Sequence, residues 1–373
     1  MKVLHVITGL GVGGAELQLR SLLRHTRHDA DVITLYNPGP VATMIESDGV
    51  PVRNLGMTRN TELSALARLY RLIRARRYDV VHAHLYRSQI YGRLAARLAR
   101  TPVVLTTEHS IGETHLERRR MTTGVRALYL TTDRCSHATI AVSDTVRDRL
   151  VKWGVPARKI SVIPNGLELD RVAFDPDARV RIRQELSIAQ DSQVIGVLGR
   201  LDPNKRFDLV IEAAGPLLTD GRRLLIVGDG DDRERLEKVA ARCGVTDRVV
   251  FAGMRHDVAA MLSAMDLFIA SSEQETFGLS VLEALSNGLP ALYTTCPALV
   301  GVETDRARQV PGEVGAMRAH IAEELAAGRR SHNPVEVVQE RYGIESVAAQ
   351  VDTLYERLRT GGPGVTAAGG TWH

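Results

Sequence analysis

Short apolar runs alternate with amphipathic stretches along most of the chain, and this alternation constrains the fold more than any other feature. In the first half, residues 3–8 form an apolar run that leucines at helical spacing follow. In the second half, the runs at 194–198 and 223–227 each lead into a helical pattern. Alternating strands and helices favour a parallel sheet, and such sheets bind ligands beyond the carboxyl ends of their strands. Because 373 residues exceed what one core usually serves, we expect two such α/β domains.

Composition indicates an ordinary globular protein, with 44% hydrophobic and 25% charged residues. Glycine breaks the first strand too early for a signal peptide, and no apolar run approaches membrane-spanning length. We therefore expect a cytoplasmic protein. The three cysteines, Cys135, Cys243 and Cys296, share no close spacing, which indicates neither a disulfide framework nor a zinc site.

Charge is spread unevenly along the chain. Residues 1–170 carry 25 Lys and Arg against 15 Asp and Glu, whereas the remainder carries 23 against 29. The basic half is compatible with an anionic partner such as a lipid-linked phosphate. Between Thr61 and Arg77, apolar residues recur at helical spacing among arginines, which is typical of a packed surface helix or of peripheral contact with the inner face of a membrane. No zinc finger, RNP-like motif or aromatic–basic interleaving is present, so nucleic acid is not an expected partner.

The stretch from Ser271 to Ala284 is the strongest candidate for the chemistry. It follows a buried-strand pattern and precedes apolar residues at helical spacing, so it predicts a strand-to-helix turn. Such a turn offers unpaired backbone N–H groups and the positive end of a helix dipole to an anion. Gly278 permits close approach of a ligand, and Glu275 and Glu283 are suited to accept hydrogen bonds from the hydroxyls of a sugar or ribose. An ordinary acidic helix start would look the same.

A glycine-rich turn follows the first strand. Gly9, Gly11 and Gly14 satisfy the G-x-G-x-x-G pattern of dinucleotide binders between a strand and a helix. The second strand, residues 31–37, lacks the terminal acid that would hold the ribose of NAD. A different phosphate contact and a purely structural tight turn both remain open for this loop.

Histidines mark the ends of two further strands. His84 and His109 sit at predicted carboxyl ends, and His82 has the position of a packed side chain. His109, flanked by Glu108 and Ser110, is the better functional candidate, although a structural loop histidine would fit equally. The polar residues 112–120 after it are typical of a loop over a site.

Cations and carboxylates follow the first two strands of the second half. Arg200 and Lys205 are suited to pair with a diphosphate, Arg through its fork and Lys as a point charge, unless they are solvated surface charges. Asp229 and Asp231 have a spacing that a divalent metal could use, but Asp-Gly is common in turns, so we expect no metal there.

Taken together, the motifs resemble those of the retaining, nucleotide-sugar-dependent glycosyltransferases of family four. The resemblance covers roughly residues 1–300 and depends on the order and spacing of its motifs. These motifs are Gly13-Gly14-Ala15-Glu16, Ile163-Pro164-Asn165-Gly166, Gly199-Arg200-Leu201 with Lys205, Val227-Gly228-Asp229-Gly230, Val250-Phe251-Ala252-Gly253 and Glu275-x7-Glu283.

The resemblance implies a role for each matching charged residue. Arg200 and Lys205 would bind the donor diphosphate and stabilise the leaving nucleotide as an electrostatic clamp. Glu283 would accept hydrogen bonds from the ribose, and Glu275 from the transferred sugar. His109 matches the family's active-site histidine near that sugar.

Further donor contacts are implied for glycines and backbone amides. Arg255 lies where the family contacts the base, and Gly13 and Gly14 would close over the phosphate from the other domain. The family needs no bound metal, and no other cofactor is implied. The amides that would cradle sugar and phosphate are those of Phe277, Gly278 and Leu279.

The fold implied is GT-B, with two Rossmann-like doubly wound parallel-sheet domains that face each other across a cleft. We expect an acceptor-side domain at 1–170, a linker at 171–190, which carries Asp175-Pro176, and a donor-binding domain at 191–340. A helix at 341–360 would return to the first domain, and 361–373 would be a disordered tail. After Cys296 the chain departs from the family pattern, because 298–314 lacks the expected glycine turn and apolar strand.

The reaction implied is transfer of a sugar from a UDP-sugar or related donor to an acceptor hydroxyl, with retention at the anomeric carbon. The acceptor is either lipid-linked, as in cell-envelope synthesis, or a small molecule, as in natural-product glycoside synthesis. Two alternatives are an NAD-dependent oxidoreductase that uses Gly9, Gly11 and Gly14, and a non-catalytic nucleotide-sugar-binding protein. The first lacks the second-strand acid and would leave Glu275 and Glu283 without a task. The intact His109 and the same glutamate pair argue against the second.

Overall fold

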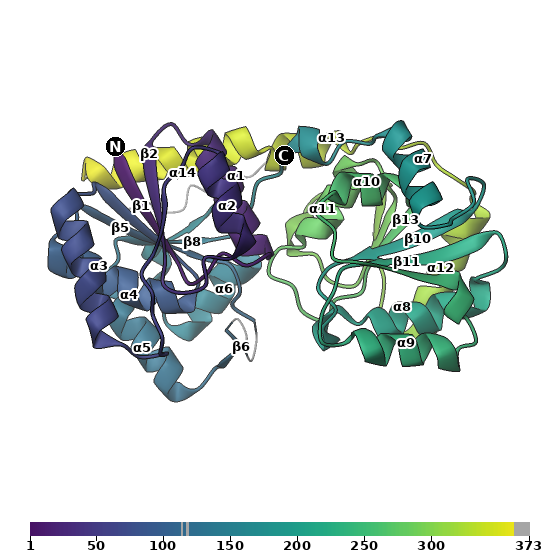
Figure 1. Ribbon diagram of the computed structural model, residues 1–373, viewed down its shortest axis with the longest axis horizontal. Coiled ribbons are helices and arrows are strands. Elements are labelled where there is room, and N and C mark those ends of the chain that lie inside the picture. The colour runs from purple at the N-terminus through teal and green to yellow at the C-terminus, as the bar shows by residue number, and fades with distance from the viewer. Residues whose placement is uncertain (113–114, 117–118, 362–373) are drawn as a thin grey trace. The chain divides into compact units, whose positions relative to one another are not determined.

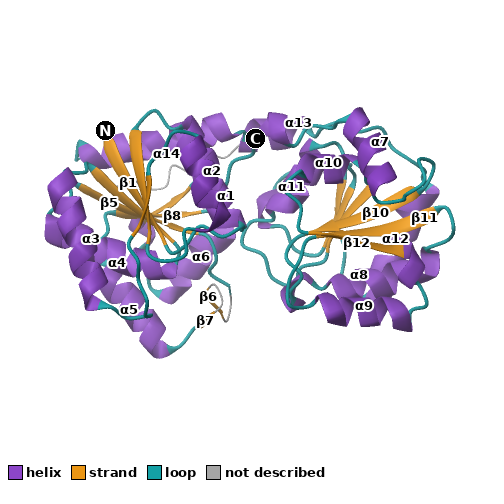
Figure 2. Ribbon diagram, viewed as in Figure 1, coloured by secondary structure: helices purple, strands orange, loops and turns teal. Residues whose placement is uncertain are grey.

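The computed structural model describes residues 1–112, 115–116 and 119–361, and its chain divides into two compact units. The first unit combines residues 1–166 with the C-terminal segment from Ile344, and the second comprises residues 167–343. Each unit has a parallel sheet with helices on both faces (Figures 1 and 2). No helix in the described ranges combines the length and the apolar character needed to cross a bilayer.

The sheet of the first unit has seven strands in the order β3-β2-β1-β4-β5-β8-β9. The order reverses between β1 and β4, so the loops that follow these two strands diverge and leave a crevice for a ligand. The strands are β1 (Lys2–Ile7), β2 (Asp29–Thr34), β3 (Val52–Asn54), β4 (Val80–His84), β5 (Val103–Glu108), β8 (Ala138–Ala141) and β9 (Ile160–Val162), and β6 (His115–Leu116) and β7 (Arg119–Arg120) form a separate antiparallel pair.

Seven helices of the described residues belong to this unit. Apolar side chains of α3 and α4 pack on one face of the sheet, and those of α1 and α14 pack on the other. The helices are α1 (Gly14–His25), α2 (Gly39–Ser47), α3 (Leu63–Arg76), α4 (Tyr86–Ala99), α5 (Thr123–Asp133), α6 (Asp144–Trp153) and α14 (Ile344–Arg359).

The sheet of the second unit has six strands in the order β12-β11-β10-β13-β14-β15, with its reversal between β10 and β13. Its strands are β10 (Gln193–Leu198), β11 (Arg222–Val227), β12 (Val249–Gly253), β13 (Leu267–Ala270), β14 (Ala291–Tyr293) and β15 (Ala307–Gln309). Its helices are α7 (Pro176–Glu185), α8 (Phe207–Ala214), α9 (Arg233–Arg242), α10 (Val258–Ser263), α11 (Leu279–Ser286), α12 (Val314–Ala326) and α13 (Glu336–Tyr342).

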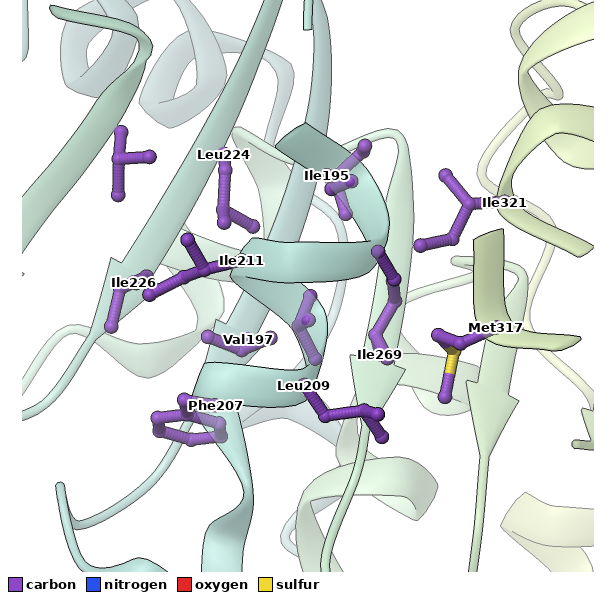
Figure 3. Close-up of a cluster of buried hydrophobic side chains, with 14 of the residues drawn as sticks. Ile195, Val197, Phe207, Leu209, Ile211, Leu224, Ile226, Ile269, Met317 and Ile321 are labelled. Atoms are coloured by element: carbon purple, nitrogen blue, oxygen red, sulfur yellow. The ribbon is translucent and has the colours of Figure 1, made fainter. Parts of the chain in front are cut away.

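The core of the second unit lies between one face of its sheet and helices α8, α9 and α12. Ile195 and Val197 of β10 meet Leu209 of α8 and Met317 of α12, and all four side chains are buried (Figure 3). Removal of this much apolar surface from water fixes the helices on the sheet. The strand ends, and the loops that follow them, are thereby held in place.

Residues 171–190, expected as a linker, contain helix α7 and lie within the second unit. The sequence conceals this because hydrogen bonds from arginines, more than apolar contacts, anchor the helix. Arg183 is fully buried and donates to the carbonyl of Ala264 at 3.0 Å and to Asp266 at 2.8 Å. Arg179 also pairs with Asp266.

One other expectation from the sequence needs correction. The segment after Cys296, expected to lack a strand, supplies the edge strand β15, whose exposed Arg308 and Gln309 disguise it. Helix α3 buries Leu69 and Ile73 in the core, as in the packed surface helix that the sequence indicated, and its Leu63 is 85% exposed. The tail expected at 361–373 lies, apart from Gly361, outside the described residues.

Candidate functional site

Two loops meet at the strand reversal of the second unit. One follows β10 and contains the short 3-10 helix Pro203–Lys205, and the other follows β13 and begins at Ser271. Asn204 joins them, because its carbonyl accepts from Glu273 N at 2.9 Å and its side-chain amide donates to Gln274 O at 2.9 Å. Ser271 Oγ donates to Lys205 O at 2.7 Å. These bonds fix two segments that are seventy residues apart in the sequence.

Lys205 and Glu275 are brought together by this arrangement. Lys205 Nζ lies 2.6 Å from Glu275 Oε1, and Ser272 Oγ donates to the same oxygen at 2.8 Å. Both side chains are mostly buried, with 23% and 19% of their surfaces exposed. The ion pair keeps a cation and a hydrogen-bond acceptor side by side at the strand ends, where a diphosphate and a sugar need them.

Helix α11 begins beside this pair. Its N-cap, Gly278, has φ = +97°, and a Cβ there would lie 2.4 Å from Cys296 Sγ, so the turn requires glycine. Among the described residues, the backbone N–H groups of Leu279 and Ser280 find no protein acceptor. The helix start therefore presents free donors and a positive dipole end. Phe277 is buried against Tyr342 and supports the turn.

Glu283 lies one turn into α11 with a half-buried side chain. Its carboxylate has no hydrogen-bond or ion-pair partner in the part of the chain that the structure describes. Burial raises the pKa of Glu283 from 4.5 to about 7. A half-buried acceptor without a partner is suited to a ligand that brings hydroxyl donors.

The loop that carries Arg200 is held by two neighbouring glycine turns. Leu201 N donates to Asp229 O at 3.0 Å, and Gly228 N donates to Gly253 O at 2.9 Å. Arg200 itself is exposed and forms no ion pair with another described residue. Its exposure fits both an anion-binding role and a solvated surface charge. Asp229 is exposed and, together with Asp231, forms no cluster that could hold a metal ion within the described residues.

Arg255, which we expected to contact the base, is engaged by two carboxylates. Its guanidinium pairs with Asp257 at 2.7 Å and with Glu185 of α7, and these carboxylates raise its pKa. The side chain is therefore neutralised within the protein. Sequence reasoning missed this because it treated the segment that contains Glu185 as a linker.

A groove of about 540 Å³ opens at the carboxyl ends of β13 and β14. Its lining includes Arg206, Ser272, Thr294 and Gln309. Thr294 Oγ1 donates to Ser272 O at 2.6 Å and thereby ties the groove wall to the loop that carries Glu275. The sequence showed no signal for this groove, because its residues come from four separate segments.

In the first unit, buried histidines occupy the strand reversal. His5 of β1 is the register partner of His82 on β4, and His84 lies on the same face two residues further on. His5 Nδ1 lies 3.0 Å from His84 Nε2, and His84 Nδ1 lies 3.3 Å from His109 Nε2. One nitrogen each of His5, His82 and His84 lie within 4.8 Å of one another, a spacing that a metal ion could also use.

Burial keeps these rings neutral. Desolvation lowers the pKa of His5 to about 3 and that of His109 to about 4, and it lowers the pKa values of His82 and His84 well below their usual value. A cavity of about 40 Å³ borders His82, His84 and His109. His5 was not among the sequence candidates, because it lies in the middle of an apolar strand.

The predicted glycine turn of the first unit leads into α1, with Gly13 as its N-cap. A Cβ at Gly13 would meet the carboxylate of Glu16, whereas the position of a Cβ at Gly14 has no heavy atom within 4 Å. Open space at the first residue of a helix is compatible with a phosphate contact.

Comparison with known proteins gives two adjacent family matches. Residues 12–171 match Glycosyltransferase Family 4, and residues 178–327 match Glycosyl transferases group 1. A UDP-Gal:alpha-D-GlcNAc-diphosphoundecaprenol alpha-1,3-galactosyltransferase from Escherichia coli is 29% identical over 296 residues, 76% of each chain. A 2-deoxystreptamine glucosyltransferase from Streptomyces kanamyceticus is 26% identical over 82% of this chain and 84% of its own.

Solved structures share the fold. The structure of Anabaena HepE in complex with UDP is 23% identical and has a TM-score of 0.83, covering 95% of this chain and all of that one. The match extends over both units, each with its parallel sheet. The chain belongs to the family-four type of glycosyltransferases with the GT-B fold, and it is a transferase.

Proposed function

We propose that the protein is a retaining, metal-independent hexosyltransferase that uses a UDP-sugar and an acceptor hydroxyl. The observation that carries this proposal is the Lys205–Glu275 pair, held at the strand reversal beside the free N–H groups of α11. Lys205 and Glu275 come from the loops after β10 and β13, the two strands between which the sheet order reverses, and doubly wound sheets bind their ligands at such a reversal.

Each side chain has a defined task in the proposed reaction. Lys205 turns from Glu275 to the diphosphate, and Arg200 joins it, so that both stabilise the charge on the departing nucleotide. Glu275 then accepts hydrogen bonds from the transferred sugar, and Glu283 from the ribose. The amides of Phe277, Gly278 and Leu279 border sugar and phosphate.

Retention follows if the acceptor attacks the anomeric carbon from the face that the diphosphate leaves. At that moment the sugar cation and the departing diphosphate form an ion pair. The departing phosphate oxygen then takes the proton of the acceptor hydroxyl, so that no carboxylate nucleophile is needed. Glu275 is an unsuitable nucleophile in this reaction, because it accepts hydrogen bonds from Ser272 and, as proposed, from the transferred sugar. In the first unit, we propose that His109 contacts the sugar and that Gly13 and Gly14 contact the phosphate.

The first test is nucleotide release from UDP-, GDP- and dTDP-sugars in the presence of a chelator. Lys205→Ala and Glu275→Ala should each lower turnover at least a hundredfold, as expected for the loss of one transition-state contact. Lys238→Ala and Glu234→Ala, on exposed positions of α9, remove the same charges outside the site and should have no effect. Full activity in Lys205→Ala, or a requirement for metal, would refute the proposal.

The configuration of the product tests retention separately. The anomeric coupling constant of the product, measured by NMR before it equilibrates, should match that of the donor. An inverted product would require an activated acceptor on the opposite face and would rule out the ion-pair reaction.

Two acceptor classes fit the chain, and the two relatives represent one each: a lipid diphosphate sugar and an aminocyclitol. We favour the lipid-linked class and peripheral membrane contact, because Arg71, Arg74 and Arg77 are exposed around the end of α3. Sedimentation with anionic vesicles should be lost when these three residues are changed to Ala. Transfer to 2-deoxystreptamine alone, without vesicle binding, would favour the small-molecule class.

A further inference from the structure

A line of three histidine rings runs through the first unit. His84 lies in the middle, bonded through Nε2 to His5 Nδ1 at 3.0 Å and through Nδ1 to His109 Nε2 at 3.3 Å. His5 and His84 are buried, with 1% and 2% of their surfaces exposed. Neither ring can exchange its partner for bulk water, so each bond must be made within the protein.

The number of protons in this line is fixed. Burial lowers the pKa of all three rings, so each is neutral at pH 7 and carries one N–H and one lone pair. His84 uses both nitrogens, and it must therefore donate one bond and accept the other. The two hydrogen bonds of the line therefore have only two arrangements, in which the donors point in opposite directions along it.

Each arrangement dictates the tautomer of the end ring. If His5 donates to His84, then His84 donates to His109, whose proton must lie on Nδ1. If His109 donates from Nε2, His84 donates to His5, and Nδ1 of His109 keeps its lone pair. Whether Nδ1 of His5 carries a proton therefore determines, through His84, whether Nδ1 of His109 carries one.

We propose that His84 and His5 are positioning residues that fix the tautomer of His109, and so decide whether its Nδ1 donates or accepts a hydrogen bond. This inference rests on the proposed function only in giving His109 a sugar hydroxyl as its partner. The histidine line itself exists without a substrate. His84 and His5 act through His109 and need no contact with the reacting atoms.

His82 lies next to this line but does not belong to it. Its Nδ1 is bonded to Tyr355 Oη and its Nε2 to Thr107 Oγ1, both at 2.7 Å. A metal ion held by His5, His82 and His84 would have to displace one of these hydroxyls and the direct His5–His84 bond. The described residues therefore favour hydrogen bonding over metal ligation at this place.

The tautomers can be observed directly by NMR of the full-length protein labelled with 15N-histidine. In the wild type, the two ring nitrogens of His109 should have the shifts of a single neutral tautomer; His109→Asn identifies the signals. His5→Phe keeps an aromatic ring but removes the nitrogens, and it should move the His109 nitrogens toward averaged values. Tyr355→Phe, which changes only the partner of His82, should leave them in place.

Unchanged His109 shifts in His5→Phe would overturn the proposal, as would one equivalent of tightly bound metal, measured by mass spectrometry of the purified protein. Because this readout needs no turnover, it remains decisive even if no donor is transferred. A failure here is thereby distinguished from a failure of the proposed function.

Turnover provides a second, matched comparison. In His84→Asn the amide occupies the place of Nδ1 and keeps a partner for His109, whereas in His84→Gln it occupies the place of Nε2 and keeps only the partner of His5. We expect the kcat of the Gln variant to be about tenfold lower than that of the Asn variant, in the range for the loss of one hydrogen bond. Donor KM should be equal in the two, because neither variant changes a residue that is proposed to contact the diphosphate or the ribose. Equal kcat values would contradict the proposal.

Discussion

Glu283 is a half-buried side chain that offers an unpaired hydrogen-bond acceptor to a ligand. Its carboxylate lies on the first turns of α11 without a partner among the described residues, and its pKa is raised to about 7. A site that offers an unpaired acceptor costs stability in the empty protein. The hydroxyls of a bound ligand would donate to this carboxylate and remove that cost. Without a ligand, the wild-type protein should therefore be less stable than a variant that lacks the charge of Glu283.

The pH dependence of stability tests this directly. Between pH 4.5 and about 7 the folded state keeps a proton on Glu283 that the unfolded state has lost, so the free energy of unfolding falls as pH rises through this window. Glu283→Gln should remove about 1–2 kcal/mol of that fall. Thermal unfolding at pH 5 and pH 8 measures it, and equal slopes in the two proteins would show that Glu283 is not the group responsible.

The site residues show which part of a binding site a sequence can predict. Lys205 and Glu275 were expected from their positions at strand ends, and the structure pairs them because β10 and β13 are neighbours. That neighbourhood depends on strand order, which no local pattern encodes. For the same reason His5 was missed, since its role depends on its position beside β4.

At the scale of elements, strands and helices with strong periodicity could be predicted, whereas those held by polar contacts could not. Helix α7 buries only Ala178, Ile182 and Arg183, so its sequence looks like a solvated linker. Strand β15 is three residues long and lies at the sheet edge, where no alternation is required. In both cases the stabilising partner lies far away in the sequence.

The glycine turn after β11, which the sequence predicted as a tight turn, is required by packing. At Gly228, φ is +136°, and a Cβ would lie 1.9 Å from the carbonyl oxygen of Gly199. Gly228→Ala should therefore lower the free energy of unfolding by about 3 kcal/mol, from strain and clash together.

Gly244→Ala is the matched control for this substitution. Gly244 also has a positive φ, +68°, but no atom lies within 4 Å of its Cβ position. It should cost only about 1 kcal/mol. Urea unfolding of both variants separates the two contributions, and equal costs would mean that the backbone at Gly199 yields to the methyl group.

At the scale of the whole molecule, the C-terminal segment of the chain belongs to the first unit, although the whole second unit precedes it in the sequence. Helix α14 packs Val351 and Tyr355 against the sheet of the first unit, and Asp352 accepts from Thr26 Oγ1 at 2.7 Å. The second unit, in contrast, is one continuous segment of the chain. Each unit has its own core, so a substitution in α14 should act on the first unit alone.

Tyr355→Phe tests this separation. It removes the hydroxyl that bonds to His82 at 2.7 Å and should destabilise the first unit by about 1 kcal/mol. Hydrogen exchange followed by mass spectrometry should speed up in β1, β4 and β5 but not in β10 or β11. Faster exchange in both sheets would show that the two units unfold together.

The late position of α14 also sets an order of events on the ribosome. When residue 166 emerges, the nascent first unit still lacks the helix that covers one face of its sheet, and 177 further residues must be made before Ile344 appears. At 5–20 residues per second this interval is roughly 10–40 s, long enough for the second unit to fold in the meantime. During translation, the unit whose residues are made first is therefore the more exposed to chaperones, and it is the last to become native.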